Sequence, residues 1–180
     1  YRGLPLDVNR GGFMLAEMGA AVLIEKRPTP HAIELVDTAI AAEANDMVRP
    51  SPDMASLHHI ASQLLDKRDI DLLHPHATGT IEHDPIELDV YKRCDVNIND
   101  IYACKGAIGH GLGTAGLASL VIACMCARAN QRPPMPWLKD PIDANIKAVA
   151  PANMPLRTQA IFAAGFAGHV AGAVLRSLTD

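Results

Sequence analysis

The stretch from Leu72 to His110 decides how this chain folds, through three segments: LLHPHATGT at 72–80, DPIE at 84–87 and YACKGAIGH at 102–110. Two apolar runs in it each end in a polar turn that contains glycine and a histidine. In an α/β sheet, the turns at the carboxyl ends of parallel strands converge on one crevice, where ligands bind. The pattern therefore predicts that His76, Lys105 and His110 meet at one site, although they are far apart in the sequence.

Composition places the chain among globular domains of ordinary size. It has 180 residues, of which 49% are hydrophobic but only 4% aromatic, so we expect one domain, residues 1–180, with a core of small aliphatic side chains. The net charge of −4, without a basic run, argues against nucleic-acid binding. No apolar stretch of membrane-spanning length is free of polar residues and no signal peptide begins the chain, so we expect a cytoplasmic protein outside the membrane.

The cysteines show no CxxC pair and no zinc-finger spacing. We therefore expect reduced, mostly buried thiols at Cys94, Cys104, Cys124 and Cys126.

Apolar patterns predict strands and helices in alternation. The expected strands are 19–25, buried on both faces, 32–42, with a helix as the alternative, 70–73, 101–104, and an antiparallel hairpin of 160–164 with 170–178. A helix is expected to begin at Ser51 as its cap, with apolar positions at Met54, Leu57, Ile60, Ala61, Leu64 and Leu65.

Two further helices follow in the pattern. One begins at Asp84, whose side chain would cap it, with Glu87 completing a capping box. The other spans 111–130 and is apolar all round, so we expect it to be buried all round. Residues 131–157 form a long proline-containing loop.

A histidine at the end of a buried strand can act as a general base or donate a hydrogen bond to a bound carbonyl. Here His76 and His110 stand in equivalent turns, and Lys105 lies shortly before the second. A nearby ammonium group would keep an imidazole neutral or order its hydrogen bonds. This arrangement favours a functional role over that of core histidines.

A metal site is the alternative from a different class. His74 and His76 alternate along a strand and so project to one face, where His83, His110 or His169 would complete the zinc site of a metal-dependent hydrolase. Because His-x-His with unplaced partners is a weak signal, we assign no metal.

Several motifs, in order, resemble those of the β-ketoacyl-[acyl-carrier-protein] synthases, the condensing enzymes of fatty-acid and polyketide synthesis. HATGT at 76–80, DPIE at 84–87 and KGAIGH at 105–110 are similar to the family's His-Gly-Thr-Gly-Thr, Asp-Pro-x-Glu and Lys-x-x-x-Gly-His. PLDVNRGGF at 5–13 and GFAG at 165–168 are similar to its Pro-Phe-Asp-x-x-Arg-Asp-Gly-Phe and Gly-Phe-Gly-Gly. The resemblance covers essentially the whole chain.

The resemblance implies an α/β, thiolase-like fold, in which this chain is the carboxyl-terminal half: a mixed five-stranded sheet with helices on both faces. It implies an acyltransferase of lipid or polyketide synthesis that joins an acyl thioester to malonyl-carrier protein by decarboxylative Claisen condensation. It implies no cofactor. The implied partners are an acyl carrier protein and a second copy of the protein, bound through the amino-terminal half.

The resemblance also implies roles for single residues. His76 and His110 would bind the malonyl thioester carbonyl and stabilise the enolate, and Lys105 would order His110. Phe166 would belong to the oxyanion and acyl pocket. The residues in supporting positions are Thr78, Thr80, Asp84 and Glu87.

Some positions depart from the family pattern. The family's nucleophilic cysteine lies in the amino-terminal half, so we expect this chain to be part of a longer enzyme and inactive alone. Ala77 replaces a glycine and should cost the turn some conformational freedom. Met18, Ser119 and the turn at 167–170 also differ. They leave open a diverged, non-elongating ketosynthase-like subunit, or a scaffold without chemistry of its own.

Overall fold

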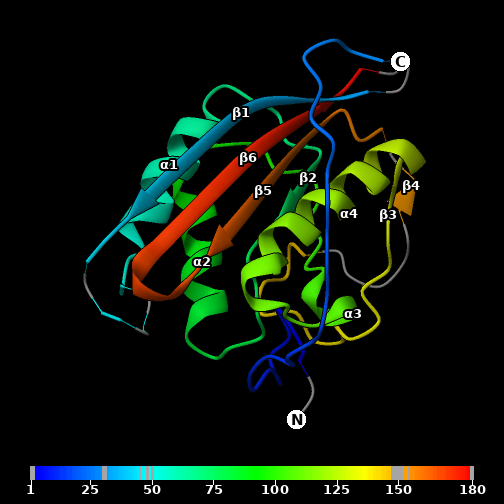
Figure 1. Ribbon diagram of the computed structural model, residues 1–180. Helices are drawn as coiled ribbons and strands as arrows, with labels where there is room; N and C mark the ends of the chain where they lie inside the picture. The colour runs from blue at the N-terminus through cyan, green and yellow to red at the C-terminus, as the bar shows by residue number, and fades with distance from the viewer. Residues whose placement is uncertain are drawn as a thin grey trace.

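The fold is built on a mixed sheet that lies between helices (Figure 1). The computed structural model describes residues 3–29, 32–44, 46–47, 49, 51–146, 152–153 and 155–178. Strand β2 runs parallel to β5, and the β5–β6 and β6–β1 pairs are antiparallel. In sheet order the strands are β1 (Ile33–Ala42), β6 (His169–Ser177), β5 (Thr158–Ala164) and β2 (Leu72–His74).

Helices cover both faces of this sheet, as expected (Figure 1). Helices α1 (Ala55–Leu65) and α2 (His83–Arg93) pack on one face, and α4 (Ala115–Ala129) packs on the other. Strand β5 alternates between them: Phe162 joins the core with α1, whereas Ile161 packs with Ala123 of α4. Because both faces are buried, this strand reads as a continuous apolar run.

The expected fifth strand at 101–104 is reduced to a single bridge. Ile101 bridges Leu73 in parallel, and Tyr102 N donates to Leu73 O at 2.9 Å, so the segment lies beside β2. Cys104 already has helical backbone angles, because α3 (Lys105–Ile108) begins directly after it. Among the described residues, the main sheet therefore has four formed strands.

A second small sheet pairs β3 (Gln131–Arg132) with β4 (Ala152–Asn153) inside the expected loop at 131–157. Residues 147–151 and 154 of this loop lie outside the described residues.

The helix expected from Ser51 begins later, at Ala55. Met54 takes a left-handed conformation there, and Ser51 donates its hydroxyl to Glu43, at the end of β1, instead of capping the helix. The other oxygen of Glu43 accepts from Ser56 N at 3.4 Å. The cap is therefore supplied by a residue that local sequence spacing did not indicate. The apolar positions predicted for this helix are all buried.

Two apolar segments are less buried than expected. Residues 19–25 form no strand and lie exposed, with Leu23 at 85% and Ile24 at 75% exposure. Helix α4 buries one face, whereas Met125 on the other is 63% exposed. By length and composition the window Leu112–Ala129, of mean hydropathy 1.6 and 28% buried, could cross a membrane, although it contains Arg128 and so is not free of polar residues; core helices pass the same test. Segment 19–25 and the outer face of α4 are therefore apolar surfaces that remain exposed in the described part of the chain.

Candidate active site

Three histidines meet where β2 ends. His76 follows β2, His83 opens α2, and His110 follows α3. The ring centroid of His76 lies 5.2 Å from that of His83 and 5.4 Å from that of His110, in edge-on arrangements. The structure thus brings His76 and His110 together, as the sequence predicts, and adds His83, which the sequence indicated only as a metal ligand.

The first histidine turn is shaped by Glu87. One carboxylate oxygen accepts from His76 N at 2.6 Å and from Tyr91 Oη at 2.7 Å, and the other accepts from Ala77 N at 2.7 Å. The predicted capping box is therefore wrong, because this side chain is directed to the turn and not to the start of its own helix. Helix α2 is instead capped by Thr80, whose hydroxyl accepts from His83 N at 3.3 Å.

Asp84 holds the next part of the same turn. Its carboxylate accepts backbone hydrogen bonds from Thr78 at 3.0 Å and Gly79 at 3.1 Å, and from Leu6 of the N-terminal segment at 2.9 Å. It too does not cap α2. Burial raises the pKa of Asp84, and these backbone donors partly oppose that effect.

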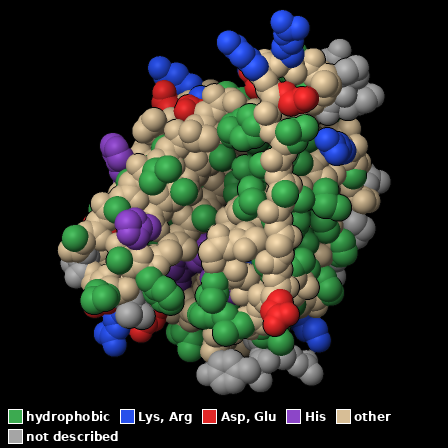
Figure 2. All heavy atoms as spheres, viewed as in Figure 1, with side chains coloured by type: hydrophobic (Ala, Val, Ile, Leu, Met, Phe, Trp, Pro, Cys, Tyr) green, Lys and Arg blue, Asp and Glu red, His purple; other side chains and the backbone are tan. Residues whose placement is uncertain are grey.

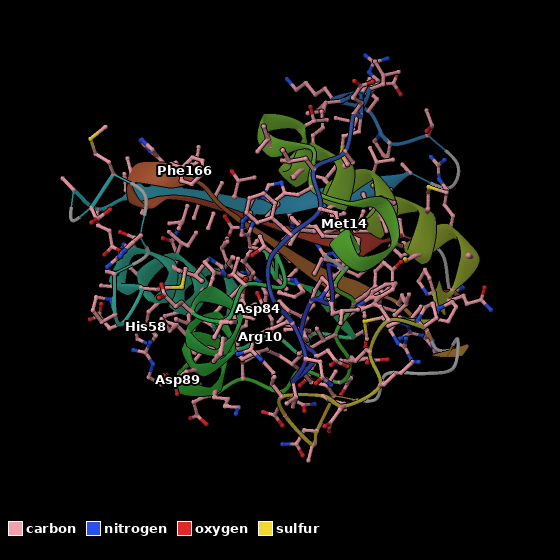
Figure 3. All side chains as sticks on the ribbon, turned by 90° about the horizontal axis from the view of Figure 1, so that it is seen from below. Arg10, Met14, His58, Asp84, Asp89 and Phe166 are labelled. Atoms are coloured by element: carbon pink, nitrogen blue, oxygen red, sulfur yellow. The ribbon has the colours of Figure 1, made fainter. Side chains whose placement is uncertain are left out.

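The N-terminal segment is tied to this turn a second time. Arg10 donates to the backbone oxygens of Thr80 at 3.0 Å and Ile81 at 2.9 Å, and Figure 3 shows it at the same end of the molecule as Asp84. Gly79 has a φ of +88°, and a Cβ there would lie 2.8 Å from Gly12 O. The backbone of Ala77 does not have a positive φ, so alanine at this position does not impose the conformational cost that we expected. The position in this turn that requires glycine is 79.

Lys105 contacts the first histidine. Its buried Nζ donates to the backbone carbonyl of His76, and not to His110, which the resemblance implied it would order. Burial lowers the pKa of Lys105, whereas Glu87 and Asp84 oppose this effect. Its charge reaches both imidazoles, since it lowers the pKa of His76 and of His110. Lys105 therefore does not order His110 through a hydrogen bond, as expected, but acts on its imidazole through charge.

His110 is oriented by its own neighbours. Its backbone pairs with the N-terminal segment, where His110 N donates to Met14 O at 2.7 Å, and its ring lies 5.0 Å from that of Phe13. Leu112 N donates to Nδ1 of His110 at 3.0 Å. An Nδ1 that accepts leaves the proton of a neutral imidazole on Nε2. Sequence spacing alone had not indicated that Phe13 and Leu112 contact this histidine.

Both histidines are neutral at pH 7. Burial, aided by the charge of Lys105, lowers the pKa of His110 to about 4 and lowers that of His76 well below its usual range. A neutral imidazole with a proton on Nε2 is a hydrogen-bond donor to a carbonyl oxygen. The pair can therefore stabilise negative charge that develops on such an oxygen.

Other predicted positions lie outside this cluster. Phe166 sits in the turn between β5 and β6, is 64% exposed, and lies well away from Asp84 in Figure 3. Thr78 and Thr80 share a hydroxyl hydrogen bond at 3.3 Å within the turn. Cys104 packs its thiol 3.2 Å from Ser119 Oγ in the core. All four cysteines are free; Cys104 and Cys126 are buried, as expected, whereas Cys94 and Cys124 are only partly buried.

The zinc alternative is contradicted. His74 turns away from the cluster, since its Nε2 bonds to Gln159 at 2.8 Å, and so it does not share a site with His76. His169 is exposed at the start of β6. In the part of the chain that the structure describes, no group of three or more His, Cys, Asp or Glu side chains could hold a metal ion.

An α/β domain with neutral histidines at the ends of its strands is typical of an enzyme active site. Comparison with known proteins assigns the family. The family model "Beta-ketoacyl synthase, C-terminal domain" matches residues 32–139. This chain therefore belongs to the β-ketoacyl synthase family.

Curated relatives agree with this assignment. The chain is 30% identical over 151 residues to the polyketide biosynthesis malonyl-ACP decarboxylase PksF of Bacillus subtilis, covering 77% of this chain and 36% of the relative. It is 29% identical over 182 residues to 3-oxoacyl-[acyl-carrier-protein] synthase 2 of Mycobacterium leprae, covering 92% and 43%. The chain thus spans less than half the length of these relatives.

Solved structures confirm the thiolase-like ketosynthase fold. The ishigamide ketosynthase/chain length factor superposes with a TM-score of 0.80 at 18% identity, covering 99% of this chain and 48% of that one. The complex AntDE:AntF, described as a type II PKS acyl-carrier protein with its ketosynthase bound to the hexaketide, gives 0.79 at 18% identity, covering 98% and 48%.

Proposed function

We propose that the protein containing this chain is a 3-oxoacyl-[acyl-carrier-protein] synthase, and that this domain binds the malonyl thioester and stabilises its enolate. The carrying observation is the adjacent, neutral pair of His76 and His110, with the Nδ1 of His110 accepting from a backbone amide. Such a pair presents donors to one substrate oxygen. Membership of the condensing-enzyme family supports the reaction type.

The chemistry follows from where charge develops. When the malonyl group loses CO₂, the bonding electron pair passes into the thioester as an enolate, whose negative charge rests on the former carbonyl oxygen. Donors held in place before the reaction stabilise this charge without reorganising, and they act more strongly in a buried site than in water. The enolate carbon then attacks the acyl thioester held by a cysteine elsewhere in the protein, forming the new carbon–carbon bond and releasing the thiolate.

Two partners belong to the proposal. An acyl carrier protein delivers the malonyl group; the support is the AntDE:AntF structure, which holds a carrier protein with its ketosynthase. A second copy of the protein forms a homodimer through the amino-terminal half, and that half covers the exposed apolar segments of this chain. Exposed apolar surface of this kind usually marks an interaction site.

The decisive experiment separates decarboxylation from acylation in the full-length protein. We expect His110→Ala to lower malonyl-carrier-protein decarboxylation by about 10²- to 10³-fold, the effect of removing one donor from an oxyanion site, while thioester formation from labelled acyl-carrier protein is retained. His59→Ala, at an exposed histidine of α1, is the control. Decarboxylation at the wild-type rate in His110→Ala would show that the role given to His110 is wrong.

A second function is favoured by one observation. The relative at 30% identity is named a malonyl-ACP decarboxylase, and such an enzyme needs the same donors but no condensation. Product analysis distinguishes the two: a 3-oxoacyl-carrier protein indicates the synthase, whereas acetyl-carrier protein as the only product indicates a non-elongating member.

A further inference from the structure

His83 is a histidine with buried ring nitrogens that the proposed mechanism does not use. It lies in the first turn of α2, its side chain is 13% exposed, and its ring meets that of His76 edge-on at 5.2 Å. Its Nδ1 lies 3.5 Å from the carboxylate of Glu87, within ion-pair distance. Both ring nitrogens are buried and make no hydrogen bond.

This burial is unfavourable for a side chain that serves packing alone. A buried polar atom without a hydrogen bond destabilises the folded state, so a hydrocarbon of similar size would fill the position at lower cost. The nitrogens of His83 therefore have an electrostatic role. The charged or polar groups near its ring include the carboxylate of Glu87 and the imidazole of His76.

His76 needs such a neighbour more than His110 does. The Nδ1 of His110 accepts from Leu112 N, which sets the ring orientation. The Nδ1 of His76 is buried without a partner, so no hydrogen bond at that atom orients its ring. The ring of His76 is contacted edge-on by the rings of His83 and His110.

We propose that His83 is a positioning residue for His76: Glu87 orients His83, and His83 orients the His76 imidazole toward the malonyl carbonyl. This inference rests on the proposed function, in which His76 is a donor. The groups that face His76 are Lys105 from α3, His110 from the following loop, and His83 and Glu87 from α2. The electrostatic effect of His83 also lowers the pKa of His76.

The test uses His83→Phe in the full-length protein, because phenylalanine keeps the ring and removes both nitrogens. We expect unchanged thermal unfolding, a higher titration midpoint for His76 in histidine-labelled NMR spectra, and a kcat for malonyl decarboxylation lower by about 10- to 100-fold with KM little changed. His83→Gln should restore part of the rate, and His59→Gln is the matched control at an exposed histidine.

The two readouts separate this inference from the proposed function. Wild-type kcat in His83→Phe, with or without a shifted titration, would overturn the positioning role. If the wild-type protein does not decarboxylate malonyl-carrier protein, the proposed function fails by itself. The His76 titration then decides alone: a shift in His83→Phe supports the coupling, and an unchanged midpoint overturns it.

Discussion

Asp84 joins two distant parts of the chain with one buried carboxylate. It accepts from the backbone of Leu6 and from the turn at Thr78 and Gly79. Removing the acceptor would leave all three amides buried and unsatisfied, each at a cost of about 1–3 kcal/mol. The residue is therefore structural, although it lies beside the histidine cluster.

We expect Asp84→Ala to lower the free energy of unfolding by about 3 kcal/mol or more, as measured by urea denaturation of the full-length protein. Asp89→Ala is the matched control on the same helix, since in the described part of the chain this exposed side chain makes an i,i+4 ion pair with Arg93, worth about 0.3–0.5 kcal/mol. Figure 3 labels both aspartates. Equal losses in the two variants would contradict the role of Asp84.

His74 makes stability depend on pH. Burial lowers its pKa to about 4, so between pH 6.5 and pH 4 the unfolded chain binds a proton at this residue and the folded chain does not. Stability must then fall as the pH falls through this window, by about 3 kcal/mol from this residue when the pH reaches 4. His74→Gln, which retains a polar group near Gln159, should show a smaller loss between pH 7 and pH 4.5 in urea titrations. Parallel losses in the two proteins would exclude this histidine as a source.

At the scale of elements, α3 depends on close packing against Trp137. A Cβ added at Gly106 would lie 2.1 Å from Cε2 of the indole ring, a distance that real contacts do not allow. At Gly113, in the 3-10 turn before α4, an added Cβ meets nothing within 4 Å. The position of Lys105, at the start of α3, therefore depends on its small neighbour.

The two glycines form a matched pair for testing this packing. We expect Gly106→Ala to lower the free energy of unfolding by about 1–3 kcal/mol through overpacking, whereas Gly113→Ala should be close to neutral. Chemical denaturation of both variants is the measurement. Combining Gly106→Ala with Trp137→Leu should recover part of the loss; without any recovery, the clash is not its cause.

At the scale of the whole molecule, one face carries a broad apolar surface. Figure 2 shows hydrophobic side chains gathered along the extended N-terminal segment and around α4, which Figure 1 places side by side. Exposed members include Leu15 at 66%, Leu23 at 85% and Met125 at 63%. A surface of this kind is typical of an interface.

We expect the 180-residue chain, expressed alone, to associate through this face. Size-exclusion chromatography with light scattering should give a mass well above the 19.2 kDa of the single chain. Leu23→Lys with Ile24→Lys should reduce the association, because a charge strongly disfavours burial in an apolar contact. A stable monomer of the unmodified chain would count against an interface here.

Local pattern was sufficient for much of the fold. Apolar runs predicted β1, for which a helix had been the alternative, and the β5–β6 hairpin, and helical spacing predicted the buried face of α1. The end-of-strand turns predicted that His76 and His110 meet. The motif order also indicated the family that the comparisons confirm.

Only the tertiary structure decided which partners the polar side chains of the site have. The sequence placed Asp84 and Glu87 at the start of a helix and therefore predicted that they cap it. In the structure both side chains bind the turn after β2, which the packing of the sheet brings next to α2. The same applies to Lys105, whose partner is the carbonyl of His76. By itself the sequence determined that His76 and His110 lie together, since strand ends converge. The tertiary structure decided that His83 joins them and which hydrogen bonds the site residues make, because these join atoms whose distances depend on how whole elements pack.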